Sequence, residues 1–168
     1  IGIASFAHMH AWSYLSALQS FKDVEIVAVA EENQDSVDCV REFEYKFYHS
    51  YEDLCSDPEI DCVLVTTENA FHAKVAILAL KNDKHVIVEK PIATTLEDAK
   101  AMIKAAEESN GILVQCYPCR YHPTSQKIKE MFQNNALGDV YAISSTNHGR
   151  MPSPEGVSSW FSNKDLAG

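Results

Sequence analysis

A charged pair follows one of the most apolar segments of the sequence. Glu89 and Lys90 come directly after Val86-Ile87-Val88, and Pro91 follows them. A lysine ammonium can polarise the oxygen of a secondary alcohol and assist proton loss while hydride leaves the carbon. An ordinary surface ion pair is worth only about 0–1 kcal/mol, but the position between an apolar run and a proline is unlike a free solvated face. We therefore take Lys90 as a candidate catalytic residue and Glu89 as the carboxylate that orients it or balances its charge.

The segment Ser5-Phe6-Ala7-His8-Met9-His10 follows the first apolar run and precedes a helical pattern. A dinucleotide site places a tight turn there, so that the N–H groups and positive dipole end of the next helix face the pyrophosphate. The usual G-x-G-x-x-G is absent, because its glycine positions carry Ser5, Ala7 and His10. Ser5 and Ala7 keep side chains small where the backbone must approach phosphate, whereas His10 replaces the glycine that permits close helix–strand packing. An ordinary strand-to-helix turn is the alternative; as a site, the turn offers the cofactor-binding candidates Ser5, Phe6, Ala7, His8 and Met9.

An acidic pair, Glu31-Glu32, ends the second apolar run about 20 residues after this turn. A carboxylate there can accept hydrogen bonds from the ribose hydroxyls of an adenosine and repel a 2′-phosphate. Glu31 is the candidate, and no Lys or Arg stands beside it in the sequence, so NAD is favoured over NADP. A solvated acidic strand end is the alternative.

Composition limits the classes of protein that fit. The 168 residues carry a formal net charge of −10, which disfavours a nucleic-acid partner because phosphate binding needs clustered Lys and Arg. No run of about 20 apolar residues and no signal peptide is present, so neither a membrane span nor secretion is expected. Five cysteines, an odd number, suit reduced thiols in the cytoplasm. Cys116 and Cys119 are spaced C-x-x-C, but no second Cys/His pair has matching spacing, so we expect no metal.

Short apolar runs alternate with segments of helical period, which predicts βαβ units and a parallel sheet. The fold class expected is α/β, a Rossmann-type doubly wound parallel sheet. Strands are expected at Ile1–Ala4, Val24–Ala30, Cys62–Thr66, His85–Glu89 and Ile112–Cys116, with a weaker one near Phe47 and Tyr48. Helices are expected at Ala11–Phe21, Ala70–Lys81, Thr95–Ser109 and Pro123–Asn134.

The pattern changes after about Tyr121. Asp139–Asn147 predicts a longer strand, and Met151–Gly156 is rich in Pro, Ser and Gly and predicts a loop. We therefore divide the chain into a dinucleotide-binding domain, residues 1–121, and the beginning of a second, α+β domain, residues 122–168. The second part is too small for a core of its own.

Four short motifs occur in a fixed order along this pattern. They are Thr66-Thr67-Glu68-Asn69-Ala70-Phe71-His72, Glu89-Lys90-Pro91, Arg120-Tyr121-His122-Pro123 and Leu137-Gly138-Asp139-Val140. The sequence thereby resembles the Gfo/Idh/MocA family of oxidoreductases along essentially its whole length. The resemblance implies a nicotinamide-dependent dehydrogenase or reductase that acts on a sugar, an inositol or a related polyol. It also implies a homo-oligomer formed through the second domain.

The same resemblance assigns further residues. It implies cofactor contacts by Thr66, Thr67, Asn69, His72, Glu89, Lys90 and Arg120, and a cis peptide bond before Pro91. His72 has a second interpretation as a capping or packing residue. Relatives carry a catalytic D-x-x-x-H segment that we expect just beyond Gly168, so residues 1–168 alone are expected to be inactive. The alternative to an enzyme is a non-catalytic nucleotide-binding or regulatory module.

Overall fold

The computed structural model describes residues 1–33, 37, 40, 44–146, 148 and 159–168. They form two compact units. The first contains residues 1–116 together with the C-terminal residues 159–168, and the second begins at Tyr117. Each unit is described by itself.

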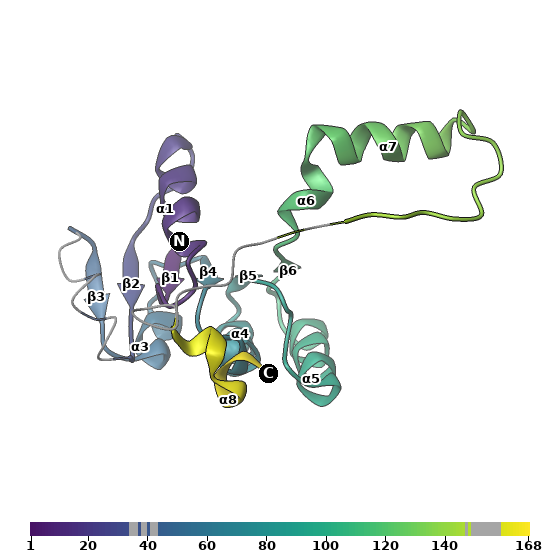
Figure 1. The fold of residues 1–168 in the computed structure, drawn as a ribbon. Coiled ribbons are helices and arrows are strands. Elements are labelled where there is room, and N and C mark those ends of the chain that lie inside the picture. Colours follow the sequence, from purple (N-terminus) through teal and green to yellow (C-terminus); the bar gives the residue numbers. More distant parts are fainter. Residues whose placement is uncertain (34–36, 38–39, 41–43, 147, 149–158) are drawn as a thin grey trace. The chain divides into compact units, whose positions relative to one another are not determined.

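Six parallel strands form the sheet of the first unit, in the order β3-β2-β1-β4-β5-β6 (Figure 1). Their bounds are β1 Gly2–Ala4, β2 Ala28–Ala30, β3 Lys46–Tyr48, β4 Cys62–Val65, β5 His85–Val88 and β6 Leu113–Gln115. This is the strand order of a doubly wound dinucleotide-binding sheet, which binds ligands where the order reverses, between β1 and β4. The predicted fold class is therefore confirmed.

Apolar side chains cover both faces of the strands. Ile3, Val29 and Leu64 pack with Leu15 of α1 (Ala11–Ser20) on one face. The alternate residues of the same strands, such as Ala4 and Val65, pack on the other face in a larger core. That core is covered by α3 (Tyr51–Ser56), α4 (His72–Lys81) and α5 (Leu96–Glu107). Burial on both faces explains why the strands are almost continuously hydrophobic.

The elements predicted for the first unit occur in the predicted order, most of them with shorter bounds. β2 covers only the last three residues of the predicted Val24–Ala30, because its partner β1 is itself three residues long and pairs from Gly2↔Ala28 onward. Thr95 caps α5 by accepting a hydrogen bond from the Asp98 N–H. Two elements were not predicted. One is α3, although Ser50 caps it and acidic residues stand in its first turn, and the other is the 3-10 turn η1 (Asn69–Phe71) that leads into α4.

The second unit contains α6 (Pro118–Tyr121) and α7 (Pro123–Gln133). The predicted strand at Asp139–Asn147 is wrong over its described part, since residues 139–146 form no strand. Tyr141 is 99% exposed and Ile143 75% exposed, and among the described residues no strand pairs with this segment. Asn147 and the predicted loop Met151–Gly156 lie outside the described residues.

The C-terminal residues 159–168 pack with the first unit. They form a 3-10 turn, η2 (Ser159–Ser162), and a short helix, α8 (Lys164–Ala167). The predicted boundary near Tyr121 falls in α6, and the extent of the two domains remains a prediction. Across the residues described, no helix is both long and apolar enough to cross a bilayer.

Candidate cofactor site and active site

The turn after β1 is held without a glycine. Ser5 has a positive φ of 73°, a conformation that costs most side chains about 1–2 kcal/mol. Its hydroxyl donates to Glu31 Oε2 over 2.8 Å and accepts from the Ala7 N–H over 2.9 Å, and the Phe6 N–H donates to the same Glu31 oxygen over 3.0 Å. A carboxylate from the end of β2 thus fixes the turn that a glycine fingerprint normally forms.

Glu31 is fully buried. Besides the turn, its carboxylate accepts from the Asn33 N–H over 3.0 Å and from the Tyr51 hydroxyl over 3.2 Å. Burial raises the pKa of Glu31, and the hydrogen bonds from Phe6, Ser5 and Asn33 oppose that rise. These donors already engage both carboxylate oxygens, so a ribose contact by Glu31 remains a prediction.

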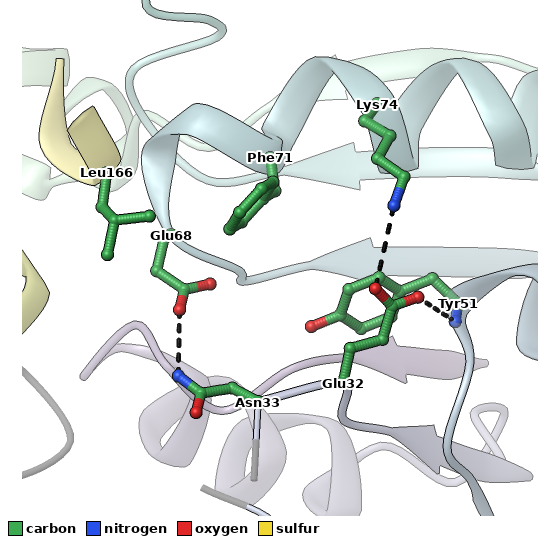
Figure 2. Close-up of a pocket in the computed structure, with 7 residues that line it drawn as sticks. All are labelled: Glu32, Asn33, Tyr51, Glu68, Phe71, Lys74 and Leu166. Carbon is green, nitrogen blue, oxygen red and sulfur yellow. Dashed lines mark hydrogen bonds and ion pairs between the residues drawn. The ribbon is translucent and has the colours of Figure 1, made fainter. Parts of the chain in front are cut away.

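The next carboxylate along the chain, Glu32, lines a cavity of about 360 Å³ at the carboxyl ends of β2 and β4. Figure 2 shows its lining residues, Glu32, Asn33, Tyr51, Glu68, Phe71, Lys74 and Leu166. Asn33 Nδ2 donates to Glu68 Oε1 over 3.2 Å, and Lys74 Nζ lies 3.7 Å from Glu32 Oε2. Lys74 is far from Glu32 in the sequence and is brought to the cavity by α4, so the neighbours of Glu31 and Glu32 in the sequence gave no sign of it.

Glu89 lies directly beyond β5 and is fully buried. Its Oε1 accepts from the Tyr14 hydroxyl over 2.6 Å and lies 2.6 Å from His10 Nδ1, and its Oε2 accepts from the Lys90 N–H. Burial alone raises the pKa of Glu89, but the hydrogen bonds from Tyr14 and His10 outweigh it, so the net pKa is lowered. Glu89 is therefore a buried, ionised carboxylate that joins the end of β5 to α1. Lys90 beside it is half-buried, and the Lys90–Pro91 peptide bond is cis.

His8 is fully buried in the turn. Its Nδ1 accepts a hydrogen bond from the His10 N–H over 3.2 Å, whereas its Nε2 has no partner among the described residues. Burial lowers the pKa of His8 from 6.5 to about 4; nearby Glu89 opposes this shift, while His10, Lys90 and His72 add to it. At neutral pH His8 is thus an uncharged ring whose Nε2–H still needs an acceptor.

The motif after β4 is held largely by its own neighbours. Thr66 Oγ1 donates to the Ser5 carbonyl over 2.7 Å, and Thr67 Oγ1 donates to the Glu68 carbonyl over 3.1 Å. His72 Nδ1 lies 2.7 Å from the Pro91 carbonyl oxygen and its Nε2 lies 3.3 Å from that of Thr67. His72 therefore joins this motif to the one after β5, and burial lowers its pKa.

Asn69 and the C-terminal residues meet at the same edge of the sheet. Asn69 Nδ2 donates to the Ala167 carbonyl over 2.8 Å, and its Oδ1 is buried without a partner in the described part of the chain. The indole N–H of Trp160 donates to the Ala7 carbonyl over 2.9 Å. Trp160 stacks on Phe161 with ring centroids 3.8 Å apart. Trp160 was not predicted as a residue of this edge, because an isolated tryptophan has no motif or spacing that would indicate such a role.

The structure thus brings most of the predicted site residues to one edge of the sheet. The turn residues, the motif after β4 and the Glu89–Lys90 pair are linked there by the contacts described above. Met9 is on the turn and about half exposed. Arg120 belongs to the second unit. His10, Tyr14, Glu32, Glu68, Lys74 and Trp160 are residues of this edge that the sequence analysis did not assign to the site.

A 3-2-1-4-5-6 parallel sheet with a buried turn at its switch point defines the chain as a dinucleotide-binding Rossmann protein. Residues 1–117 match the family model described as "Oxidoreductase family, NAD-binding Rossmann fold" of the Gfo/Idh/MocA group. The chain belongs to this family.

Known relatives and structures agree with that assignment. Trans-1,2-dihydrobenzene-1,2-diol dehydrogenase of Danio rerio is 40% identical over 96 residues, which are 57% of this chain and 29% of the relative. D-xylose 1-dehydrogenase (NADP(+)) of Hypocrea jecorina is 33% identical over 135 residues, 74% of this chain and 34% of the relative. Inositol dehydrogenases are also among the relatives.

The fold is also that of a solved dehydrogenase. The WlbA dehydrogenase from Bordetella pertussis, in complex with NADH and UDP-GlcNAcA, aligns with a TM-score of 0.77 at 24% identity, covering 83% of this chain and 43% of that one. The chain therefore spans between about 29% and 46% of the length of these relatives and 43% of the solved enzyme.

Proposed function

We propose that the full-length protein is an NAD(P)-dependent oxidoreductase that transfers hydride between the nicotinamide and a hydroxyl-bearing carbon of a sugar, inositol or related polyol. The observation that carries the proposal is the position of Glu89 and Lys90. They follow β5 at the ligand-binding edge of the sheet, and Glu89 is bonded to His10 and Tyr14 beside the cofactor turn. Glu89 thereby holds the backbone N–H of Lys90 beside the segment that would hold the cofactor.

The residues at this edge fit a dinucleotide. The turn keeps small residues, Ser5 and Ala7, where a pyrophosphate approaches the backbone. His8 Nε2 and Asn69 Oδ1 are buried polar atoms that have no partner among the residues the structure describes, and buried polar groups are normally hydrogen-bonded. We assign these two atoms to the cofactor, with His8 donating and Asn69 accepting. Thr66, Thr67 and His72 would position the surrounding backbone, and the cofactor contact of Arg120 remains a prediction.

In the reaction, bound nicotinamide supplies the hydride acceptor or donor. The Lys90 ammonium would hold the reacting oxygen of the substrate and stabilise negative charge that develops on it. Glu89 keeps that end of the site anionic and holds the Lys90 backbone through its N–H. Expected activity belongs to the full-length protein, because this chain covers only part of its relatives.

We further propose that the cofactor is NAD, although relatives include an enzyme named as NADP-dependent. The cavity at the end of β2 carries two carboxylates, Glu32 and Glu68, against one ammonium, Lys74. A 2′-phosphate placed there would meet an excess of negative charge. A ribose hydroxyl would instead find carboxylate acceptors.

Binding assays test the cofactor choice. Full-length protein should bind NADH more tightly than NADPH, measured by nicotinamide fluorescence. Glu32→Gln should reduce the difference in affinity between NADH and NADPH. It removes the carboxylate 3.7 Å from Lys74, so the lysine becomes free to pair with a 2′-phosphate. Lys104→Gln, which alters an exposed lysine that pairs with Glu108 just beyond α5, is the control. Equal or reversed affinities in the unmodified protein would overturn the assignment to NAD.

The catalytic assignment is tested with Lys90→Met, which keeps length and apolar volume but removes the charge and the donors. We expect NADH affinity within a few-fold of the original and a loss of at least about a hundredfold in kcat. If kcat stays within about threefold while affinity collapses, Lys90 is a cofactor or structural residue instead.

The alternative, a non-catalytic nucleotide-binding module, is favoured by one observation. The C-terminal residues form hydrogen bonds with two residues of the proposed cofactor site. The Ala167 carbonyl accepts from Asn69, and the Trp160 indole donates to the Ala7 carbonyl. Under that alternative the full-length protein binds NADH but oxidises none of a panel of sugars, inositols and diols. The cytoplasmic location and the homo-oligomer remain predictions.

A further inference from the structure

His10 occupies the position where the dinucleotide fingerprint has its third glycine, and its side chain is 40% exposed. One edge of the ring is fixed, because Nδ1 lies 2.6 Å from Glu89 Oε1. Nε2, on the opposite edge of the ring, has no hydrogen-bond partner among the described residues. A histidine thus occupies a position that normally needs glycine for close packing. Its Nδ1 is held by Glu89, and its Nε2 is left to interact with a ligand.

The hydrogen-bond pattern fixes the location of the ring proton. An ionised carboxylate can only accept hydrogen bonds, and Glu89 already accepts from Tyr14 and Lys90. The short contact between Glu89 Oε1 and His10 Nδ1 therefore places a proton on Nδ1. In the neutral ring this leaves the lone pair on Nε2, which is the arrangement of an imidazole oriented by a carboxylate to act as a base.

The surroundings hold the ring in this orientation. His8 accepts from the His10 N–H, and its ring centroid lies 4.7 Å from that of His10. The rings of Tyr14 and His10 meet edge to face, with their centroids 6.1 Å apart. The other ionisable groups around this pair are the Lys90 ammonium, His72, and the Cys116 thiol beside Tyr14.

A metal ion is the rival use of this cluster, since ligand atoms of His8, His10 and Glu89 lie within 4.8 Å of one another. The hydrogen bonds disfavour it. His8 Nδ1 accepts from a backbone N–H, so the neutral ring carries its proton on Nε2, and His10 Nδ1 donates to Glu89. A metal ion would have to break the hydrogen bond to His8 Nδ1 and the one between His10 Nδ1 and Glu89. Proton transfer at His10 Nε2 leaves both intact.

We infer that His10 is an acid–base catalyst of the proposed reaction and that Glu89 is its positioning carboxylate. The inference rests on the proposed function. In the oxidation direction the substrate alcohol gives its O–H proton to His10 Nε2 and its C–H hydride to oxidised NAD(P). The products are a carbonyl compound, reduced NAD(P) and a protonated His10 imidazole. Lys90 holds the oxygen during this step, and reduction of the carbonyl runs the same transfers in reverse.

The test compares His10→Gly and His10→Gln in the full-length protein, with the exposed His49→Gln as control. Glycine is the residue that the fingerprint normally has, so His10→Gly should fold and should keep NADH affinity within a few-fold. Oxidation of myo-inositol, D-xylose or trans-1,2-dihydrobenzene-1,2-diol should fall by at least about a hundredfold in kcat. Added imidazole should restore part of the kcat of His10→Gly but not that of His10→Gln, which leaves no space for it. Turnover of His10→Gly within threefold of the original, or no imidazole rescue, would overturn the inference.

A second measurement does not need turnover. Long-range ¹H–¹⁵N spectra of the histidine rings in the full-length protein with NADH should show His10 protonated at Nδ1 and bare at Nε2. The opposite tautomer would contradict the role of Glu89 even if none of the three probes reacts. Failure of the unmodified protein to bind NADH would instead count against the proposed function, so the two failures are distinguishable.

Discussion

At the scale of single residues, the switch point of the sheet is built from polar side chains that satisfy one another. Ser5 takes the strained φ usually given to glycine, and its hydroxyl links Glu31 to the Ala7 N–H. The glycine fingerprint has thus been replaced by a hydrogen-bonded one. Stability of the turn then depends on a side chain rather than on backbone freedom.

Ser5→Ala and Ser5→Gly separate these two contributions. Both remove the hydroxyl and leave buried partners unpaired, which costs about 1–3 kcal/mol. Only alanine keeps the steric penalty of a positive φ, about 1–2 kcal/mol. Ser5→Ala should therefore have the lower free energy of unfolding, measured by urea denaturation. Equal stabilities would mean that the backbone at Ser5 is not strained.

His8 makes stability depend on pH. Its pKa in the folded chain, about 4, lies below the ordinary value of 6.5, so the unfolded chain binds the proton more tightly. The contribution is fully present above pH 6.5 and is lost as the pH falls toward 4. The free energy of unfolding should decrease across this window, and His8→Asn should make the decrease smaller. An unchanged slope would show that His8 titrates normally.

At the scale of elements, α5 shows how a helix face determines the cost of a mutation. Met102 is fully buried in the core beneath the sheet, whereas its neighbour Ile103 is 50% exposed. Met102→Ala should lower the free energy of unfolding by about 2–5 kcal/mol, and Ile103→Ala by no more than about 0.5 kcal/mol. Urea denaturation of the pair checks this, and similar losses would show that α5 packs in another register.

The elements were also the best predicted part of the molecule. Val63 to Val65 and Val86 to Val88 are covered on both faces, so their nearly continuous hydrophobicity marked them as inner strands, and Thr95 marked the start of α5. Asp139 to Ile143 carried an equally apolar pattern but has no pairing strand in the described region, and local sequence does not encode the presence of a partner. Candidate site residues were predictable where a motif follows a strand. His10 and Lys74 were not, because their roles come from contacts between distant segments.

At the scale of the whole molecule, the proposed cofactor would bridge segments from across the first unit. The phosphate-binding turn, the cavity beside Glu32 and the Glu89–Lys90 pair come from different βα units of the sheet. A ligand that binds all of them stabilises the folded state as a whole, because the unfolded chain cannot assemble the site.

NADH at a hundred times its Kd should therefore raise the free energy of unfolding by about 2.7 kcal/mol. Thermal denaturation of the full-length protein measures the shift. Reduced nicotinamide mononucleotide at the same concentration should give a smaller shift, since it lacks the adenosine expected beside Glu32. Equal shifts would place the adenosine outside that cavity.

Trp160 gives the molecule an optical signal of its own. The chain has two tryptophans; Trp12 is 44% exposed and Trp160 only 4%. The emission of Trp160 should therefore be the bluer of the two, and its indole is bonded to the carbonyl of Ala7. A reduced nicotinamide absorbs in the range where tryptophan emits, so NADH bound at this turn would quench the fluorescence of Trp160 by energy transfer. In the Trp12→Phe variant only Trp160 emits, so its fluorescence reports in real time the fraction of protein that has cofactor bound at this turn.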